Sequence, residues 1–203
     1  MNLIDFYNMV PMLVLATLAG YLFGAIPLAQ RISYWHGVDI FATGTRLAGS
    51  SNVRLSVGKL PGFIVLAGDL AKGVAAVLLS EYIGIDGAWI LAPIAAAVVG
   101  HCKSVFSNFR GGDGLATLGG AIIAVFPVMG VVSILAAMAV SLGAQGLPYT
   151  SLLGVVFGYV TLAVLVVAFD GDSSSIVMGI GAISAIMLAH ALNGHRLRAR
   201  YTD

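Results

Sequence analysis

The chain has 203 residues, of which 59% are hydrophobic and only 9% are charged, and its formal net charge is +1. A soluble domain carries about 25% charged residues, so these few charges could not cover a water-facing surface, and the composition indicates a membrane protein. The low net charge excludes a broad basic face for nucleic acid. A single cysteine excludes an internal disulfide, and four scattered histidines do not suggest a metal site.

Apolar segments long enough to be membrane helices can be placed in chain order. A helix needs about 20 apolar residues to cross the hydrocarbon core. Four segments fit this pattern at least in part: residues 6–30, 60–80, 87–102 and 173–194. The second is interrupted by Asp69 and Lys72, and the third is short. The only long connection is the loop over residues 31–59, and loops of that length are usually functional or disordered.

Between the third and last segments, residues 114–169 contain no Lys, Arg, Asp or Glu and could hold two helices or three. Residues 146–149, Gly-Leu-Pro-Tyr, form a clear break because Gly and Pro end helices, and Pro127 is a second candidate break. The competing interpretation is one long tilted helix kinked at Pro127, which gives six spans in place of seven.

The basic residues favour three helices in this stretch. With the N-terminus outside and seven spans, nine of the ten Lys and Arg residues face inside, and Lys72 is the exception. This distribution follows the positive-inside rule. We therefore expect an all-α integral membrane protein, a bundle of about seven transmembrane helices with the N-terminus out and the C-terminus in. Without an internal repeat, residues 1–203 are expected to form a single domain.

The reactive side chains gather in four segments at the predicted inner membrane edge: residues 43–54, 101–117, 149–151 and 190–196. Gly111, Gly112, Asp113 and Gly114 stand just before a predicted helix. Glycines let backbone N–H groups approach a ligand, and the N–H groups at a helix start favour anions. The run therefore has the context of an anion-binding loop, although a plain helix-entry turn explains it as well.

Five motifs along the chain resemble, in order and spacing, those of one enzyme family. They are Thr45–Val53, the Asp-x-x-Lys-Gly of Asp69–Gly73, the long motif of Gly100–Thr117, Tyr149–Leu152 and His190–Leu197. The family is that of bacterial membrane acyltransferases of the PlsY type, which transfer an acyl chain from acyl phosphate to glycerol 3-phosphate. The resemblance covers almost the whole chain and also implies seven helices and an active site on the inner side.

The chain departs from the family motifs at several positions. Asp113 replaces the lysine of the family's Gly-Gly-Lys-Gly turn, and a carboxylate there should repel a phosphate. Asp113 equally suits the start of a helix, where it would occupy the anion-binding loop itself. Arg46-Leu47 replaces a family Gly-Asn, Ser104 a proline, and Leu55 an arginine. We hypothesise that Arg46 or Arg54 takes over the lost phosphate contact, since a guanidinium can grip phosphate with two hydrogen bonds.

The resemblance implies roles for individual residues. The expected catalytic residues are Ser151, His190 and Asn193, and the expected substrate- or phosphate-binding residues are Thr45, Arg46, Ser51, Asn52, Arg54, Arg110, Gly111, Gly112, Asp113 and Gly114. Alternatives remain open. Ser151 could be a helix N-cap, and His190 with Asn193 could be a pair that ties two helices together. Asp69 and Lys72 form an intramembrane pair that could be functional or purely structural.

The implied activity is acyl transfer to glycerol 3-phosphate, which gives lysophosphatidic acid for phospholipid synthesis. Acyl phosphate is already activated, so no cofactor is expected. The expected partners are acyl phosphate, glycerol 3-phosphate and membrane lipids, in a monomer or homodimer. The expected location is the bacterial plasma membrane, as a multi-pass protein with its active site on the cytoplasmic side. The alternatives are a divergent paralogue that has lost this reaction or uses another acceptor, and a small transporter.

Overall fold

In the computed structural model, residues 3–144 and 150–199 are described, with side chains for residues 7–144, 150 and 152–189. Regular structure within these ranges is helical, apart from an isolated antiparallel bridge between Ser104 and Arg110. Contacts divide the chain into two compact units, Met1–Val125 and Phe126–Asp203. The prediction of an all-helical membrane protein is confirmed in this coarse form.

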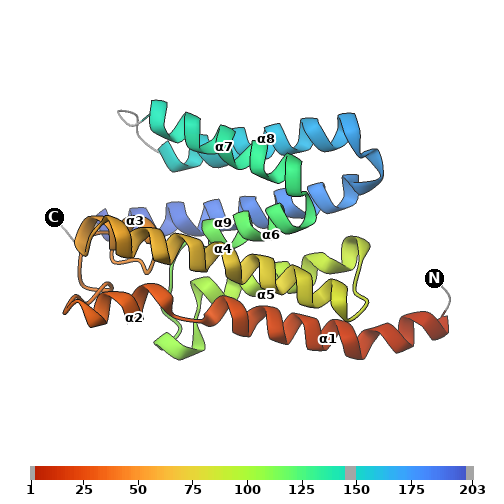
Figure 1. Cartoon of the computed structure of the whole chain (residues 1–203), viewed down its shortest axis with the longest axis horizontal. Helices are drawn as coiled ribbons and strands as arrows, with labels where there is room; N and C mark the ends of the chain where they lie inside the picture. The colour runs from red at the N-terminus through yellow and green to blue at the C-terminus, as the bar shows by residue number, and fades with distance from the viewer. Residues whose placement is uncertain (1–2, 145–149, 200–203) are drawn as a thin grey trace. The chain divides into compact units, whose positions relative to one another are not determined.

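The described residues of the first unit form six α-helices and two short 3₁₀ turns (Figure 1). Its elements are α1 (Leu3–Ala25), α2 (Leu28–Trp35), α3 (Ser50–Ser56), α4 (Lys59–Tyr82), η1 (Gly87–Ile90), α5 (Leu91–Cys102), η2 (Val105–Ser107) and α6 (Leu115–Val125). The expected long loop over residues 31–59 thus contains the end of α2 and all of α3.

The first predicted span, residues 6–30, is broken near its end. The chain leaves the helical conformation after Ala25, and Pro27 precedes the short helix α2. The hydroxyl of Ser104 donates a hydrogen bond to the Ala25 carbonyl that the break leaves free. In α2, Tyr34 and Trp35 are about three-quarters exposed, at 77% and 76%.

Glycines allow the helices of the first unit to meet backbone to backbone. A Cβ added to Gly73 of α4 would collide with the Thr117 carbonyl of α6, and one added to Gly120 would collide with the Leu70 carbonyl of α4. A Cβ at Gly24 of α1 would likewise meet the backbone of α5. Small residues at such crossings are the usual device for packing helices within a bilayer, where no hydrophobic force draws helices together.

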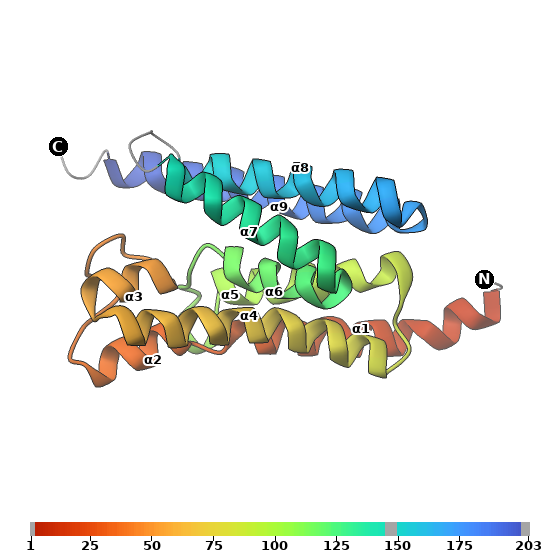
Figure 2. The same cartoon turned by 45° about the horizontal axis from the view of Figure 1, so that its top comes forward.

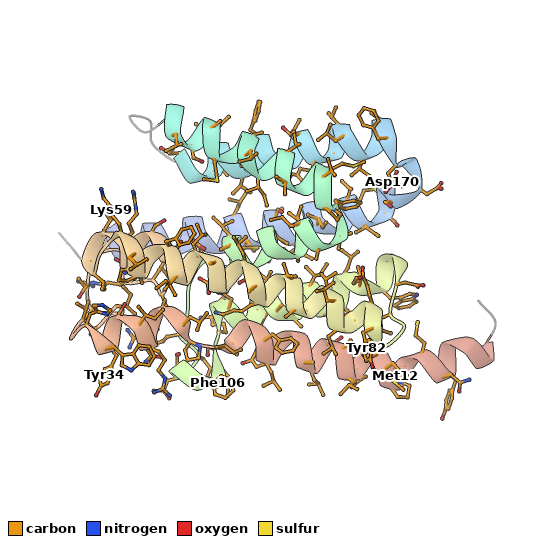
Figure 3. All side chains as sticks on the ribbon, viewed as in Figure 1. Met12, Tyr34, Lys59, Tyr82, Phe106 and Asp170 are labelled. Atoms are coloured by element: carbon orange, nitrogen blue, oxygen red, sulfur yellow. The ribbon has the colours of Figure 1, made fainter. Side chains whose placement is uncertain are left out.

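The polar ends of the first unit differ in charge. Lys59 begins α4 and Lys103 follows α5, so both lie at the end of the unit that also carries Arg31. Glu81 lies in the last turn of α4, and Asp86 in the turn that follows, at the opposite end. Figure 3 shows this separation, with Tyr34 and Lys59 at one end and Tyr82 at the other.

The second unit consists of α7 (Pro127–Gly143), α8 (Thr150–Phe169), η3 (Gly171–Ser173) and α9 (Ser174–Ala199). Gly154 and Gly158 of α8 lie against α7, and Gly181 of α9 lies against Tyr159 of α8. The short turn η3 joins α8 and α9 into an antiparallel hairpin, which Figure 2 shows as two adjacent helices.

The charge-free stretch of residues 114–169 contains three separate helices in the described part of the chain. α6 ends at Val125, Phe126 has non-helical φ and ψ of −127° and 76°, and α7 begins at Pro127. Proline is well suited to a first helical position because its missing N–H would have no partner there. The expected break at Pro127 is therefore present, whereas the break expected at residues 146–149 lies outside the described residues.

Four helical segments in the described ranges are long and apolar enough to cross a membrane: Tyr7–Trp35, Lys59–Tyr82, Leu152–Phe169 and Gly171–Ala189. Three further apolar helices are shorter, at Gly87–Cys102, Leu115–Val125 and Pro127–Gly143. α6 has 11 residues, and at about 1.5 Å of rise per residue it covers about half of the hydrocarbon core of about 30 Å.

Candidate active site

The first polar loop is the segment that joins α2 to α3. Its shape is held by the side chain of Asn52, which is 2% exposed. Its amide nitrogen donates to the carbonyls of Ile40, Thr43 and Leu47, at 3.2, 3.0 and 3.0 Å. Its amide oxygen accepts from Thr45 N and from the Ser56 hydroxyl, both at 3.2 Å. Asn52 therefore holds the shape of the loop, and its expected role in substrate binding stays a prediction.

Four of the expected binding residues in this region are exposed. Two lie in the loop, Thr45 and Arg46, and two lie in α3, Ser51 and Arg54. Arg46 has φ of 58°, in the left-handed region that favours glycine. Arginine occupies this left-handed backbone at some cost in strain.

The second polar loop is the segment that joins α5 to α6. Main-chain hydrogen bonds hold it against the end of α5 and the first polar loop. Gly112 N donates to the His101 carbonyl at 3.2 Å, and Ala48 N donates to the Gly111 carbonyl at 3.1 Å. Gly111 and Gly112 therefore connect the end of α5 to the loop that Asn52 shapes. The structure thus brings two of the four predicted polar segments together.

Asp113 caps α6. Its Oδ1 accepts a hydrogen bond from Leu115 N at 3.1 Å, while Gly114 provides the left-handed residue before the helix, with φ of 77°. The carboxylate thus engages one of the free N–H groups that an anion would otherwise meet at a helix start. This contact agrees with the alternative interpretation of Asp113 as a helix-start residue.

Arg110 lies beside the same loops. Its Nη2 donates to the Phe41 carbonyl at 3.3 Å, and its guanidinium carbon is 4.1 Å from the centroid of the Phe41 ring. These contacts hold the cation near the first polar loop, in a cation–π arrangement. Nearby, the buried Ser107 hydroxyl donates to Gln30 Oε1 at 2.6 Å and ties the turn η2 to α2.

Four buried polar side chains from α4, α5 and α6 meet within the first unit. Lys72 Nζ donates to Asp69 Oδ1 at 2.7 Å, and the same oxygen lies 3.6 Å from Nδ1 of His101. That nitrogen also shares a hydrogen bond of 3.2 Å with the hydroxyl of Thr117. The exposed fractions are 2% for Asp69, 6% for Lys72, 6% for His101 and 0% for Thr117. The expected Asp69–Lys72 pair exists and extends to two further residues.

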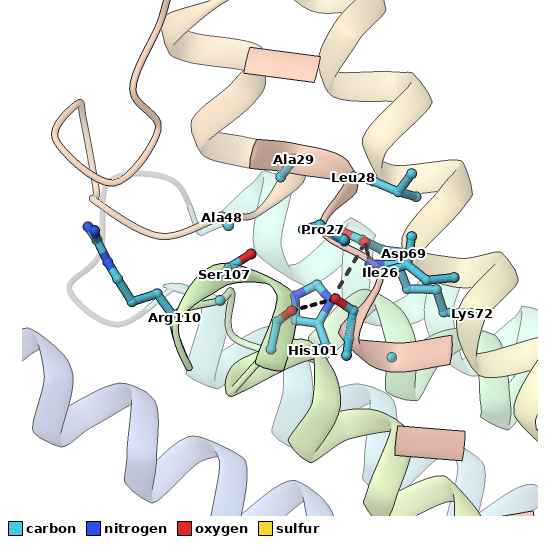
Figure 4. A pocket seen from close by; sticks show the side chains of 14 residues that line it. Ile26, Pro27, Leu28, Ala29, Ala48, Asp69, Lys72, His101, Ser107 and Arg110 are labelled. Atoms are coloured by element: carbon cyan, nitrogen blue, oxygen red, sulfur yellow. Dashed lines mark hydrogen bonds and ion pairs between the residues drawn. The ribbon is translucent and has the colours of Figure 1, made fainter. Parts of the chain in front are cut away.

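A small cavity adjoins this cluster at the break between α1 and α2 (Figure 4). Its polar lining comprises Asp69, Lys72, His101, Ser104, Ser107 and Arg110. The cavity volume is about 10 Å³, which is room for about one water molecule. Figure 4 shows the Arg110 side chain extending away from the group formed by Asp69, Lys72 and His101.

The expected catalytic residues belong to the second unit. Ser151 is the second residue of α8, so it lies inside the first helical turn and not at the N-cap. His190 and Asn193 are three residues apart near the end of α9, and residues at this spacing share a helix face. In the α8–α9 hairpin, the start of α8 and the end of α9 are at the same end. The side chains of these three residues lie outside the described part of the structure.

His101 and Thr117 are absent from the expected site residues, although the structure places both in the buried cluster. A histidine at the end of an apolar helix is costly unless it has a partner, which was the available sequence signal for His101. The hydroxyl of Thr117 gave no comparable signal, because its partner is 16 residues away and on another helix.

Comparisons with known proteins identify the family to which the chain belongs. A model of the glycerol-3-phosphate acyltransferase family matches residues 14–200. A glycerol-3-phosphate acyltransferase of Geobacter sulfurreducens is 31% identical over 91% of this chain and 93% of its own. One of Rubrobacter xylanophilus is 44% identical, over 58% of this chain and 59% of its own length, and one of Deinococcus radiodurans is matched over 64% of its length. The chain thus spans about three-fifths of these last two relatives.

Among solved structures, PlsY, an integral membrane glycerol 3-phosphate acyltransferase in its glycerol 3-phosphate form, superposes with a TM-score of 0.77. Sequence identity is 27%, and 92% of each chain is covered. The chain therefore belongs to the glycerol-3-phosphate acyltransferase family. These matches confirm the family that the motifs predict.

Asn52→Ala tests the first polar loop. The change leaves three carbonyls without their donor, so we expect the free energy of unfolding to fall by about 2–3 kcal/mol. Thermal denaturation in detergent would measure the change. The matched control is Ser51→Ala, an exposed neighbour on the same helix, for which a shift of under about 0.5 kcal/mol is expected. Equal shifts for the two variants would contradict the assigned role of Asn52.

Proposed function

We propose that this protein transfers an acyl group from acyl phosphate to glycerol 3-phosphate and releases lysophosphatidic acid and inorganic phosphate. The family match over residues 14–200 carries the proposal. The solved PlsY structures are described as glycerol 3-phosphate and lysophosphatidic acid forms, which supports this acceptor and product. The two polar loops joined at Gly111 and Ala48 supply a site of matching polarity.

The proposed reaction depends more on aligning the two substrates than on activating the acyl donor, which is already reactive. The acceptor hydroxyl oxygen attacks the acyl carbon and forms the new ester bond, while its proton passes to a base. The bond between the acyl carbon and the phosphate oxygen then breaks, and phosphate leaves with the electron pair. Because the mixed anhydride is already reactive, the enzyme mainly aligns the two substrates and binds the departing phosphate. No cofactor enters this scheme.

Three residues of the second unit are assigned to the reacting groups. His190 orients or deprotonates the acceptor hydroxyl, since histidine is the usual side chain for proton transfer near neutral pH. Asn193 holds the acceptor or its phosphate, and Ser151 hydrogen-bonds the acyl phosphate or the acceptor. The antiparallel course of α8 and α9 supports this assignment, because it brings these three backbone positions to the same end of the hairpin.

The phosphate is assigned to the two polar loops of the first unit. Main-chain N–H groups at Gly111, Gly112 and Gly114 contribute to an anion-binding loop, although Asp113 already uses the Leu115 N–H. Positive charge then has to come from arginine. Arg46, Arg54 and Arg110 are exposed near these loops, with Thr45 and Ser51 as polar neighbours.

The protein is assigned a multi-pass arrangement in the bacterial plasma membrane, with seven spans, the N-terminus out and the site on the cytoplasmic side. The positive residues at one end of the first unit support this orientation. Seven apolar helical segments support the count, with three of them short. The whole chain, residues 1–203, acts as one enzyme domain, as a monomer or homodimer embedded in membrane lipids.

An acyl-transfer assay tests the function directly. Purified protein is incubated with acyl phosphate and labelled glycerol 3-phosphate, and lysophosphatidic acid is quantified. We expect product from the wild type and a loss of at least about 100-fold in kcat for His190→Ala, the scale of a lost general base. Ser151→Ala should also lose activity. His195→Ala, a nearby histidine without an assigned role, is the control and should retain activity.

The wild type's failure to form product would contradict the proposal and favour the divergent paralogue. Full activity in His190→Ala would leave acyl transfer in place but would remove His190 from the mechanism.

Arg46→Gly and Arg54→Ala test which cation binds the phosphate. Arg46→Gly should keep or raise the free energy of unfolding, by up to about 1 kcal/mol, because it relieves a left-handed backbone. Removing a guanidinium that contacts the phosphate should raise KM for glycerol 3-phosphate by about tenfold or more. An Arg54→Ala protein with unchanged KM would exclude Arg54, and the same result for Arg46→Gly would exclude Arg46.

Asp113→Lys restores the family residue. If Asp113 weakens the phosphate site by its negative charge, this change should lower KM for glycerol 3-phosphate or raise kcat/KM. Asp113→Asn serves as the control, because an amide can still accept from Leu115 N without carrying the charge. Unchanged or lower activity in both variants would mean that the site has been rebuilt around the carboxylate.

A further inference from the structure

The buried cluster of Asp69, Lys72, His101 and Thr117 calls for a functional explanation. Removing an ion pair from water costs several kcal/mol for each ion, and an apolar pair of similar volume is often as stable. An ionisable pair within a membrane helix is therefore a functional candidate by default. The cluster is nevertheless closed to a substrate, because its side chains are at most 6% exposed and the adjoining cavity holds about one water.

The cluster meets the Gly111–Gly112 loop at His101. The His101 carbonyl accepts the hydrogen bond from Gly112 N. A Cβ on Gly111 would collide with the same carbonyl, and a Cβ on Gly112 would collide with Nε2 of the His101 ring. The ring and the carbonyl of His101 thus both lie against the loop.

The opposite edge of the His101 ring is held by the other members of the cluster. Nδ1 shares a hydrogen bond with the Thr117 hydroxyl and lies 3.6 Å from Asp69 Oδ1, which Lys72 binds in turn. Thr117 is brought to this place by Gly73, whose missing side chain admits the Thr117 backbone against α4. One ring therefore links the ion pair of α4 to the two glycines.

We propose that Asp69, Lys72 and Thr117 form a positioning network that acts through His101 to hold the Gly111–Gly112 loop in its phosphate-binding shape. The inference rests on the proposed function, because it assigns the loop to the substrate phosphate. Asp69, Lys72 and Thr117 touch no reacting atom. Their loss should weaken acceptor binding with little effect on the chemical step.

The test compares isosteric variants at Thr117. Thr117→Val removes the hydroxyl, whereas Thr117→Ser keeps it. We expect Thr117→Val to raise KM for glycerol 3-phosphate by about fivefold or more, the scale of one lost hydrogen bond, with kcat within about twofold. Thr117→Ser should restore KM. The control Ser80→Ala removes another buried hydroxyl of the first unit, one bonded to the Ala76 carbonyl, and should leave KM unchanged.

The variant Asp69→Asn/Lys72→Gln separates positioning from charge neutrality. It removes both charges, so a pair that only balances charge within the membrane should be replaced without a change in KM. We expect KM to rise as in Thr117→Val, because the Asp69 contact with His101 is weakened. If this double variant does not fold, the comparison of Thr117→Val with Thr117→Ser decides the inference alone.

Amide hydrogen exchange provides a readout that does not depend on acyl transfer. Exchange at Gly112 N–H should be at least about tenfold faster in Thr117→Val than in the wild type or Ser80→Ala. If the wild type forms no product, the proposed function fails, and exchange at Gly112 still tests the network. Unchanged KM and unchanged Gly112 exchange in Thr117→Val would overturn the inference, as would equal effects in Ser80→Ala.

Discussion

The close crossing of α4 and α6 is the contact on which the site of the first unit depends. Gly73 and Gly120 allow the two backbones to touch, and any side chain at either position would push the helices apart. Only at this separation can Thr117 reach the ring of His101, which also faces Asp69. Glycine at these two positions therefore lets Thr117 join the buried cluster, whose Asp69–Lys72 hydrogen bond lies within α4 itself.

Three residues that the sequence marks as unusual for the resembled motifs each have a defined local setting in the structure. The Asp113 carboxylate accepts a hydrogen bond from Leu115 N at the start of α6. The Ser104 hydroxyl donates to the carbonyl of Ala25. Arg46 adopts a left-handed conformation that suits glycine better. Two of these three residues thus satisfy a local backbone group.

Much of the fold could be predicted because long apolar runs in the sequence indicate membrane helices. The helices around Asp69, before Lys103 and after Pro127 all follow from this pattern. The partners of Asn52 and of Thr117 could not be predicted, because they depend on how loops and helices meet in space. The break after Ala25 could be predicted only in part. Pro27 is a known helix breaker, but the apolar run over residues 6–30 continues through it without a change in composition.

The short helix α2 carries two large aromatic side chains, Tyr34 and Trp35, that are about three-quarters exposed. Tyr and Trp are enriched where a bilayer meets water, because their rings are apolar and their O–H and N–H groups are polar. In the proposed function, this preference sets the height of α2 and of the loop that follows it at the membrane surface. A water-soluble acceptor and a membrane-dissolved donor can both reach that boundary.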